Sequence, residues 1–107
     1  MNKISVLKLK SILENESQNS IIIDVRRYDE REQGYINGTI HIPLDELSIK
    51  LDDVIEMAKD KNLYFYCGSG ARSANATTVF LQAGFKNTAN VKGGILEWEK
   101  AGFEITK

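Results

Sequence analysis

One stretch of the chain, residues 62–85, constrains the fold more than any other. Leu63-Tyr64-Phe65-Tyr66 is an unbroken run of apolar and aromatic residues, which favours a buried β-strand. Gly68 and Gly70 follow, and glycine allows backbone angles that a residue with a Cβ resists. From Ala71 onwards, residues recur at the three- and four-residue spacing of a helix face: Ser73, Ala76, Thr77, Phe80 and Gly84. The stretch therefore predicts a strand, a turn and a helix.

The only cysteine of the chain, Cys67, falls at the junction between this strand and this helix. Unpaired N–H groups at a helix start and the helix dipole both stabilise a thiolate, so we expect a pKa below the free value of about 8.5. Arg72 adds a cation, and Ser69 and Ser73 add hydroxyl donors. Free cysteines are often buried and inert. Here the glycines, the arginine and the helix start instead favour a reactive thiolate among donors for an anionic group.

The run C-G-S-G-A-R-S at residues 67–73 resembles the active-site loop of rhodanese-like domains, a family of sulfurtransferases. Two further segments match the family in order. The first contains Asp24-Val25-Arg26, Glu30, Gly34, Ile36, Gly38 and Ile42-Pro43, and the second contains Gly84-Phe85, Gly93-Gly94 and Trp98. The resemblance extends from about Ile4 to about Phe103, which is nearly the whole chain.

The resemblance implies a small five-stranded sheet with the reactive loop at its carboxyl edge. It also implies a sulfane-sulfur transfer in which Cys67 is the catalytic nucleophile and becomes a persulfide. The donor would be thiosulfate or another persulfide, and the acceptor cyanide or a thiol. The residues expected to bind the substrate are Gly68, Ser69, Gly70, Ala71, Arg72 and Ser73, and Asp24 and Arg26 are the expected supporting residues.

Length and composition limit the number of domains, the classes of partner, the location and the metal or cofactor sites that can be expected. A chain of 107 residues is the size of one domain, so we expect a single domain over residues 1–107. Fourteen basic and fifteen acidic residues leave a net charge of −1, which favours neither a nucleic acid nor a membrane as partner. One cysteine cannot form an internal disulfide, and neither a signal peptide nor a membrane span is evident, so the cytoplasm is the expected location. One cysteine and one histidine support no metal site, and we expect no cofactor.

The rest of the chain alternates helices and strands. Helices are expected after Ser5, around Asp29 and Glu30, in two pieces over 44–58, and from Ile95 to Gly102. Strands or extended segments are expected at 20–24, 36–43 and 88–91. This alternation predicts an α/β fold with a small, mostly parallel sheet flanked by helices on both faces. Asp24 and Cys67 both follow strands, so they are expected at the same sheet edge.

Several residues also have a purely structural interpretation. We favour such a role for Asp24, which could cap the following turn, and for Arg26, which could pair with Glu30. His41 in an edge-like strand is expected at the surface or in packing, and Trp98 in the core or a pocket wall. Gly93-Gly94 lacks the lysine and the other glycines of a phosphate loop, so a plain turn is expected.

Two other function classes compete with sulfur transfer. Cysteine-dependent phosphatases and arsenate reductases also place a thiolate before a helix, but they generally need C-x5-R, whereas Cys67 and Arg72 form C-x4-R. A persulfide carrier in a sulfur relay, or a partner-binding module, is the second alternative. Gly68 leaves Arg72 as the only cation of the loop, so we expect inefficient use of thiosulfate and faster transfer from a persulfide.

Overall fold

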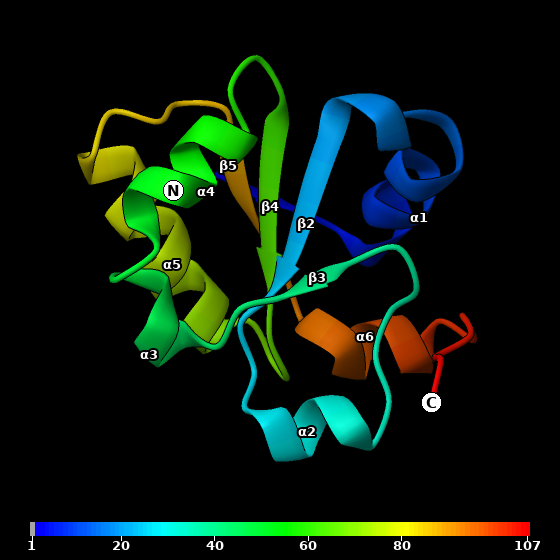
Figure 1. Ribbon diagram of the computed structural model, residues 1–107. Helices are drawn as coiled ribbons and strands as arrows, with labels where there is room; N and C mark the ends of the chain where they lie inside the picture. The colour runs from blue at the N-terminus through cyan, green and yellow to red at the C-terminus, as the bar shows by residue number, and fades with distance from the viewer. Residues whose placement is uncertain (1) are drawn as a thin grey trace.

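The computed structural model describes residues 2–107, and its centre is one sheet of five parallel strands (Figure 1). The strand order is β1-β5-β4-β2-β3. The strands are β1 (Lys3–Ile4), β2 (Ser20–Asp24), β3 (Ile40–His41), β4 (Asn62–Tyr66) and β5 (Thr88–Val91). Because all strands run the same way, their carboxyl ends meet at one edge, where Cys67 follows β4. This confirms the predicted fold class.

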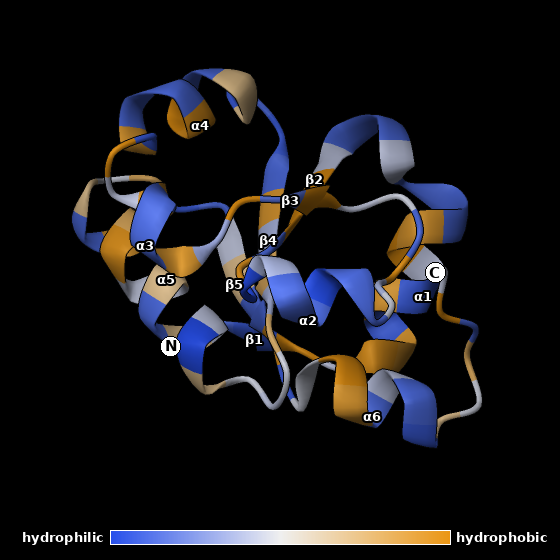
Figure 2. Ribbon diagram, turned by 60° about the horizontal axis from the view of Figure 1, so that its bottom comes forward, coloured by the Kyte–Doolittle hydropathy of each residue, from blue (hydrophilic) through white to orange (hydrophobic). Residues whose placement is uncertain are grey.

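Helices cover both faces of the sheet (Figure 1). On one face lie α1 (Val6–Asn15) and α6 (Gly94–Lys100), and on the other lie α3 (Leu44–Leu47), α4 (Leu51–Met57) and α5 (Ala71–Gln82). A short helix, α2 (Tyr28–Glu32), lies beyond the carboxyl ends of β2 and β4 and is largely hydrophilic (Figure 2). A 3-10 turn, η1 (Ser17–Asn19), joins α1 to β2.

The side chains of the central strands alternate between two buried clusters. On the α1 and α6 face, Ile22 and Tyr64 pack with Leu9 and Trp98. On the α5 face, Ile23, Leu63 and Phe65 pack with Phe80. Both faces of β2 and β4 are therefore buried, which explains why these strands read as continuous apolar runs.

Most expected elements are present within a residue or two of their expected positions, including the two-piece helix over 44–58. Ser5 caps α1 by accepting a hydrogen bond from the backbone N–H of Lys8 at 3.1 Å. Two elements differ. The extended segment 36–43 contains only the two-residue edge strand β3, and β1, which no residue pattern singled out, pairs with the edge of β5.

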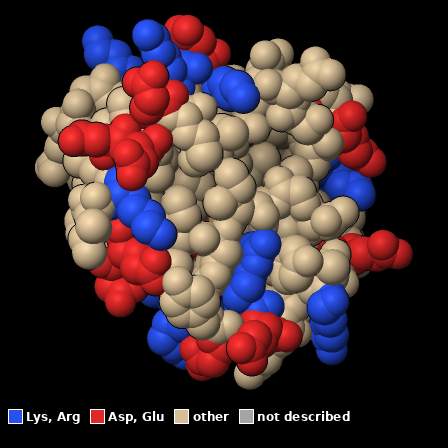
Figure 3. Space-filling view, in the orientation of Figure 1, with Lys and Arg blue, Asp and Glu red and all other residues tan. Residues whose placement is uncertain are grey.

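On the face seen in Figure 3, acidic and basic side chains are interspersed, and neither sign of charge forms a continuous patch. Within residues 2–107, none of the helices is long and apolar enough to span a membrane.

Candidate active site

Cys67 lies in a tight loop between the end of β4 at Tyr66 and the start of α5 at Ala71. The loop closes at Gly70, whose φ of +107° belongs to the left-handed region that favours glycine. Gly68 does not need such a backbone, contrary to the expectation from sequence. Its role is spatial instead, because a Cβ at this position would lie 3.3 Å from Nη2 of Arg72.

The Cys67 sulfur is surrounded by donors and is only 1% exposed. Its Sγ accepts hydrogen bonds from the backbone N–H of Gly70 at 3.1 Å and from Oγ of Ser73 at 3.3 Å. Burial raises the pKa of the thiol, but the Ser73 hydroxyl and the N–H groups of Ser73, Gly70 and Ser69 together outweigh burial and lower the pKa below its ordinary value. The loop therefore favours the thiolate, in the direction that the sequence predicts.

Arg72 does not stand free beside the sulfur. Its guanidinium forms a two-pronged ion pair with Glu30 of α2, with Nη1–Oε1 at 2.7 Å and Nη2–Oε2 at 2.9 Å. The hydrogen bonds from Arg72, opposed by desolvation, lower the pKa of Glu30 from 4.5 to about 2. Glu30 also accepts a hydrogen bond from the backbone N–H of Arg27, which caps α2. The sequence indicated Glu30 as a matching position, but not this pairing.

Two groups outside the loop hold its backbone in place. The N-terminus of α6 donates to loop carbonyls: Ile95 N–H to Cys67 at 3.0 Å and Leu96 N–H to Gly68 at 3.1 Å. This approach requires Gly94, where a Cβ would lie 2.3 Å from the Cys67 carbonyl oxygen. The buried Asn90 of β5 donates to the Gly70 carbonyl, and its side-chain oxygen shares the one proton of the Ser73 hydroxyl with Cys67 Sγ. Gly93 lies in the expected turn, but Gly94 already begins α6 and packs against the backbone of the reactive loop.

Asp24 and Arg26, the expected supporting residues, lie at the same carboxyl edge of the sheet as Cys67 and form a hydrogen-bond network separate from the loop. Asp24 is fully buried and accepts from the backbone N–H of Arg26 at 3.0 Å, which is the expected turn cap. The Arg26 guanidinium bonds the Asp24 carboxylate at 2.9 Å, and Arg31 and Tyr66 also donate to it. The expected pairing of Arg26 with the Glu30 carboxylate is wrong, since Glu30 offers Arg26 only its backbone carbonyl. Asp24 is thereby saturated with donors.

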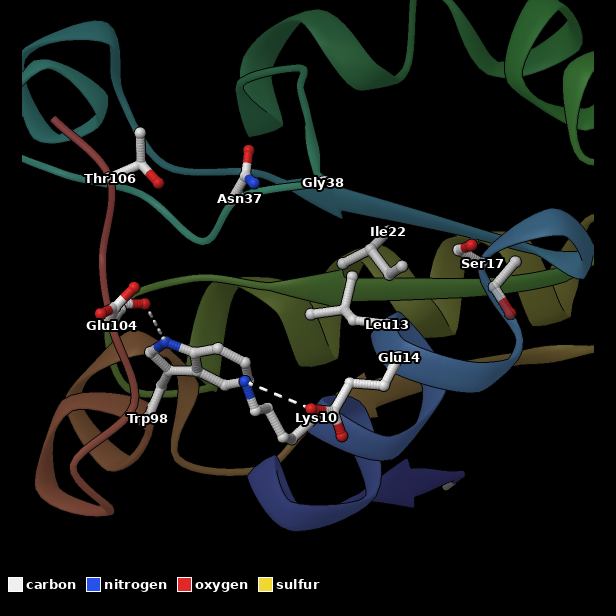
Figure 4. A pocket seen from close by; sticks show the side chains of 11 residues that line it. Lys10, Leu13, Glu14, Ser17, Ile22, Asn37, Gly38, Trp98, Glu104 and Thr106 are labelled. Carbon is white, nitrogen blue, oxygen red and sulfur yellow. Dashed lines mark hydrogen bonds and ion pairs between the residues drawn. The ribbon is translucent and has the colours of Figure 1, made fainter.

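His41 lies on the edge strand β3, where it packs against the ring of Tyr28 and hydrogen-bonds the backbone carbonyl of Arg26 at 2.7 Å. This agrees with a packing role. Trp98 is buried and forms a wall of a cavity of about 360 Å³, where its Nε1 donates to the Glu104 carbonyl at 2.8 Å and Lys10 pairs with Glu14 (Figure 4). No residue of the 67–73 loop lines that cavity.

A separate hollow of about 430 Å³ lies beside the reactive loop. Gly68 forms part of its wall, together with Leu96 of α6 and Gly34, which follows α2. Its charged lining residues are Arg26, Glu30, Glu99 and Lys107.

A parallel α/β sheet with a stabilised thiolate loop at its carboxyl edge defines a class of cysteine-dependent α/β proteins. Within that class, the profile described as Rhodanese-like domain matches residues 5–101. The chain therefore belongs to the rhodanese-like domain family, as its motifs indicated.

Relatives and a solved structure agree with this assignment. The chain is 31% identical over 90 residues to a sulfurtransferase of Allochromatium vinosum, a match that covers 84% of this chain and 81% of that protein. It is 35% identical over 88 residues to the tRNA uridine(34) hydroxylase of Photorhabdus laumondii, covering 79% of this chain. The chain spans only 25% of the length of that relative. A crystal structure of thiosulfate sulfurtransferase from Pseudomonas aeruginosa superposes with a TM-score of 0.87 at 27% identity, covering 99% of this chain and 20% of that one.

Proposed function

We propose that the protein is a sulfurtransferase that moves a sulfane sulfur through a Cys67 persulfide. The observation that carries the proposal is the pair of hydrogen bonds from Gly70 N–H and Ser73 Oγ to the Cys67 sulfur, inside a C-x4-R loop. These donors stabilise the thiolate that attacks. The backbone N–H groups of residues 68–72 and the Ser73 hydroxyl would then hold the terminal sulfur of the persulfide, as an oxyanion hole holds an oxyanion.

The reaction has two half-reactions. In the first, the Cys67 thiolate attacks the outer sulfur of the donor, a new S–S bond forms, and the old bond breaks with its electron pair leaving on sulfite or on the donor thiolate. In the second, cyanide or a thiolate attacks the terminal sulfur of the persulfide, and the electron pair of that S–S bond returns to Cys67. Thiocyanate or a new persulfide departs. No cofactor is needed, and the kinetics are ping-pong.

Steady-state kinetics with thiosulfate or glutathione persulfide as donor and cyanide as acceptor test this proposal. The expected result is thiocyanate formation with parallel double-reciprocal lines, abolished in Cys67→Ser. Converging lines would mean that donor and acceptor bind together without a covalent intermediate. Thiocyanate formation by Cys67→Ser at the wild-type rate would refute the role of Cys67.

A second candidate, a persulfide carrier that serves a partner protein, is favoured by the modular use of similar domains. The tRNA uridine(34) hydroxylase match covers a quarter of that protein, so a comparable unit forms part of a longer chain there. A carrier would load a sulfur on Cys67 in one turnover but release it slowly to small acceptors. Comparing the single-turnover loading rate with the steady-state rate separates the two functions. The C-x4-R spacing continues to count against a phosphatase.

A further inference from the structure

The charge of the reactive loop is already compensated before any substrate enters. Arg72 is the only basic residue of the 67–73 loop, and both of its terminal nitrogens bond the Glu30 carboxylate. The pair is half-buried, with 34% of the Arg72 side chain and 23% of the Glu30 side chain exposed. An ion pair shielded in this way is weakened less by salt than one on the open surface. Because the pKa of Glu30 is lowered to about 2, its carboxylate stays ionised at neutral pH.

The other arginines near this edge of the sheet also pair with a carboxylate, although Arg26 and Arg31 share a single one, so one positive charge of that network is left over. Arg26 and Arg31 both bond the buried carboxylate of Asp24. In the hollow beside Gly68, two basic and two acidic residues share the wall. At the loop itself, a dianion such as thiosulfate would therefore meet a cation that is already paired with a carboxylate, although the backbone N–H of Gly70 still points at the sulfur.

We propose that Glu30 is a specificity-determining residue that sets the sulfur donor of this site. Its carboxylate holds and neutralises the Arg72 guanidinium, so a dianionic donor must compete with Glu30 for the only loop cation. A persulfide has at most one negative charge at its reacting end, and its outer sulfur can be held by backbone N–H groups, so it needs no such competition. The inference rests on the proposed function of Cys67 and names the chemical class of its donor: a persulfide rather than thiosulfate.

Glu30→Gln tests the inference with little change of shape. Glutamine keeps an oxygen that can cap the Arg27 N–H, but it removes the negative charge from Arg72. Asp29→Asn is the matched control, because Asp29 lies next to Glu30 on α2, pairs with Arg27, and loses the same unit of charge away from Arg72. The first readout is the ratio of alkylation rates of Cys67 by anionic iodoacetate and neutral iodoacetamide at one pH. This ratio measures anion attraction without any sulfur transfer.

We expect Glu30→Gln to raise the iodoacetate-to-iodoacetamide ratio about threefold or more, and Asp29→Asn to change it little. The ratio of kcat/KM for thiosulfate to kcat/KM for glutathione persulfide should rise by a similar factor. The double variant Glu30→Gln/Arg72→Gln should keep the wild-type value of both ratios, because it removes one negative and one positive charge together. Circular dichroism and a thermal melt verify that each variant is folded.

Equal effects of Glu30→Gln and Asp29→Asn would overturn the inference, since the charge would then act at long range. So would an unchanged alkylation ratio in Glu30→Gln, or a double variant whose ratio is as high as that of Glu30→Gln. If Glu30→Gln fails to fold by itself, the double variant Glu30→Gln/Arg72→Gln still decides, because it should keep the wild-type alkylation ratio if Glu30 has already neutralised Arg72. A large fall would contradict neutralisation. Absence of a Cys67 persulfide with either donor would instead refute the proposed function, and it would leave the alkylation result interpretable by itself.

Discussion

Ser73 has the most direct influence on the reactive sulfur, because its hydroxyl donates to Cys67 Sγ while its backbone N–H also lowers the thiol pKa. We expect Ser73→Ala to raise the pKa of Cys67, because a hydrogen bond that stabilises the thiolate is lost. The pH dependence of iodoacetamide alkylation measures this pKa. Thr78→Ala is the control, since the Thr78 hydroxyl on the same helix bonds only the Ala74 carbonyl. Equal shifts in both variants would assign the effect to the helix rather than to the hydroxyl.

Glu30 also makes the fold sensitive to acid. Its pKa falls from 4.5 to about 2 in the folded protein, so its ion pair adds stability above pH 4.5, and this stability is lost as the pH falls toward 2. Urea unfolding at pH 5 and pH 3 should therefore show a smaller loss of unfolding free energy for Glu30→Gln than for the wild type. An identical loss in both proteins would show that the pair does not persist in solution.

At the scale of elements, the reactive loop depends on the close approach of α6. Gly94→Ala would add a Cβ 2.3 Å from the Cys67 carbonyl oxygen, at a φ of +58°. Gly102→Ala is a matched control with a φ of +84° and no neighbour within 4 Å. We expect roughly 1 kcal/mol of destabilisation at Gly102 from backbone strain, and roughly 2–4 kcal/mol at Gly94 from strain and steric conflict. Denaturant unfolding measures the free energy of unfolding of both variants. Similar losses at Gly94 and Gly102 would mean that the contact between α6 and the loop leaves room for a Cβ.

The elements themselves were largely predictable, because each follows a local pattern. In residues 62–85, an apolar run predicts the strand, the glycines predict the turn, and the three- and four-residue spacing predicts the helix. Ser5 is a typical N-cap residue and so predicts the start of α1. β1 was not predictable, since two residues, Lys3 and Ile4, contain no period and form a strand only because β5 offers an unpaired edge. Met57 continues the three- and four-residue spacing of the apolar face of α4, but it is 39% exposed because it is the last residue of that helix.

The site was predictable where it is local and unpredictable where it is assembled from distant segments. Cys67, Ser73 and the helix start lie within one short stretch, so the thiolate could be inferred from residues 67–73. The partner of Arg72 lies 42 positions away, and Asn90 reaches the loop from β5. A signal for Asn90 did exist: it is the one amide in the otherwise apolar and small strand Thr88–Val91, where burial demands a hydrogen-bond partner.

For the molecule as a whole, the balance of charge predicts which donor is used. The chain carries a net charge of −1, and the arginines near the sulfur are paired with Asp24 or Glu30. We therefore expect detectable but slow thiosulfate:cyanide activity and faster transfer from glutathione persulfide. Rates for both donors, measured side by side at equal concentration, check this expectation. Faster transfer from thiosulfate would contradict it.

The variant Gly68→Arg tests the same comparison of thiosulfate and persulfide rates with one more positive charge at the site. A side chain at this position would crowd Nη2 of Arg72, which lies 3.3 Å from the place of the Cβ. The substitution adds one positive charge beside the loop, so we expect the thiosulfate rate to rise relative to the persulfide rate, on the order of severalfold. Gly68→Gln, of similar size and without the charge, is the control. The same rise in both variants would identify altered shape, rather than charge, as the cause.

The central claim is that Cys67 carries the transferred sulfur. Intact-protein mass spectrometry after brief exposure to a persulfide donor, followed by removal of excess donor, tests it most directly. The account predicts one added sulfur atom per chain in the wild type, located by peptide mapping on the peptide that contains Cys67, lost on addition of cyanide, and absent in Cys67→Ser. A wild-type protein that gains no sulfur, or a Cys67→Ser variant that gains it equally, would contradict the account.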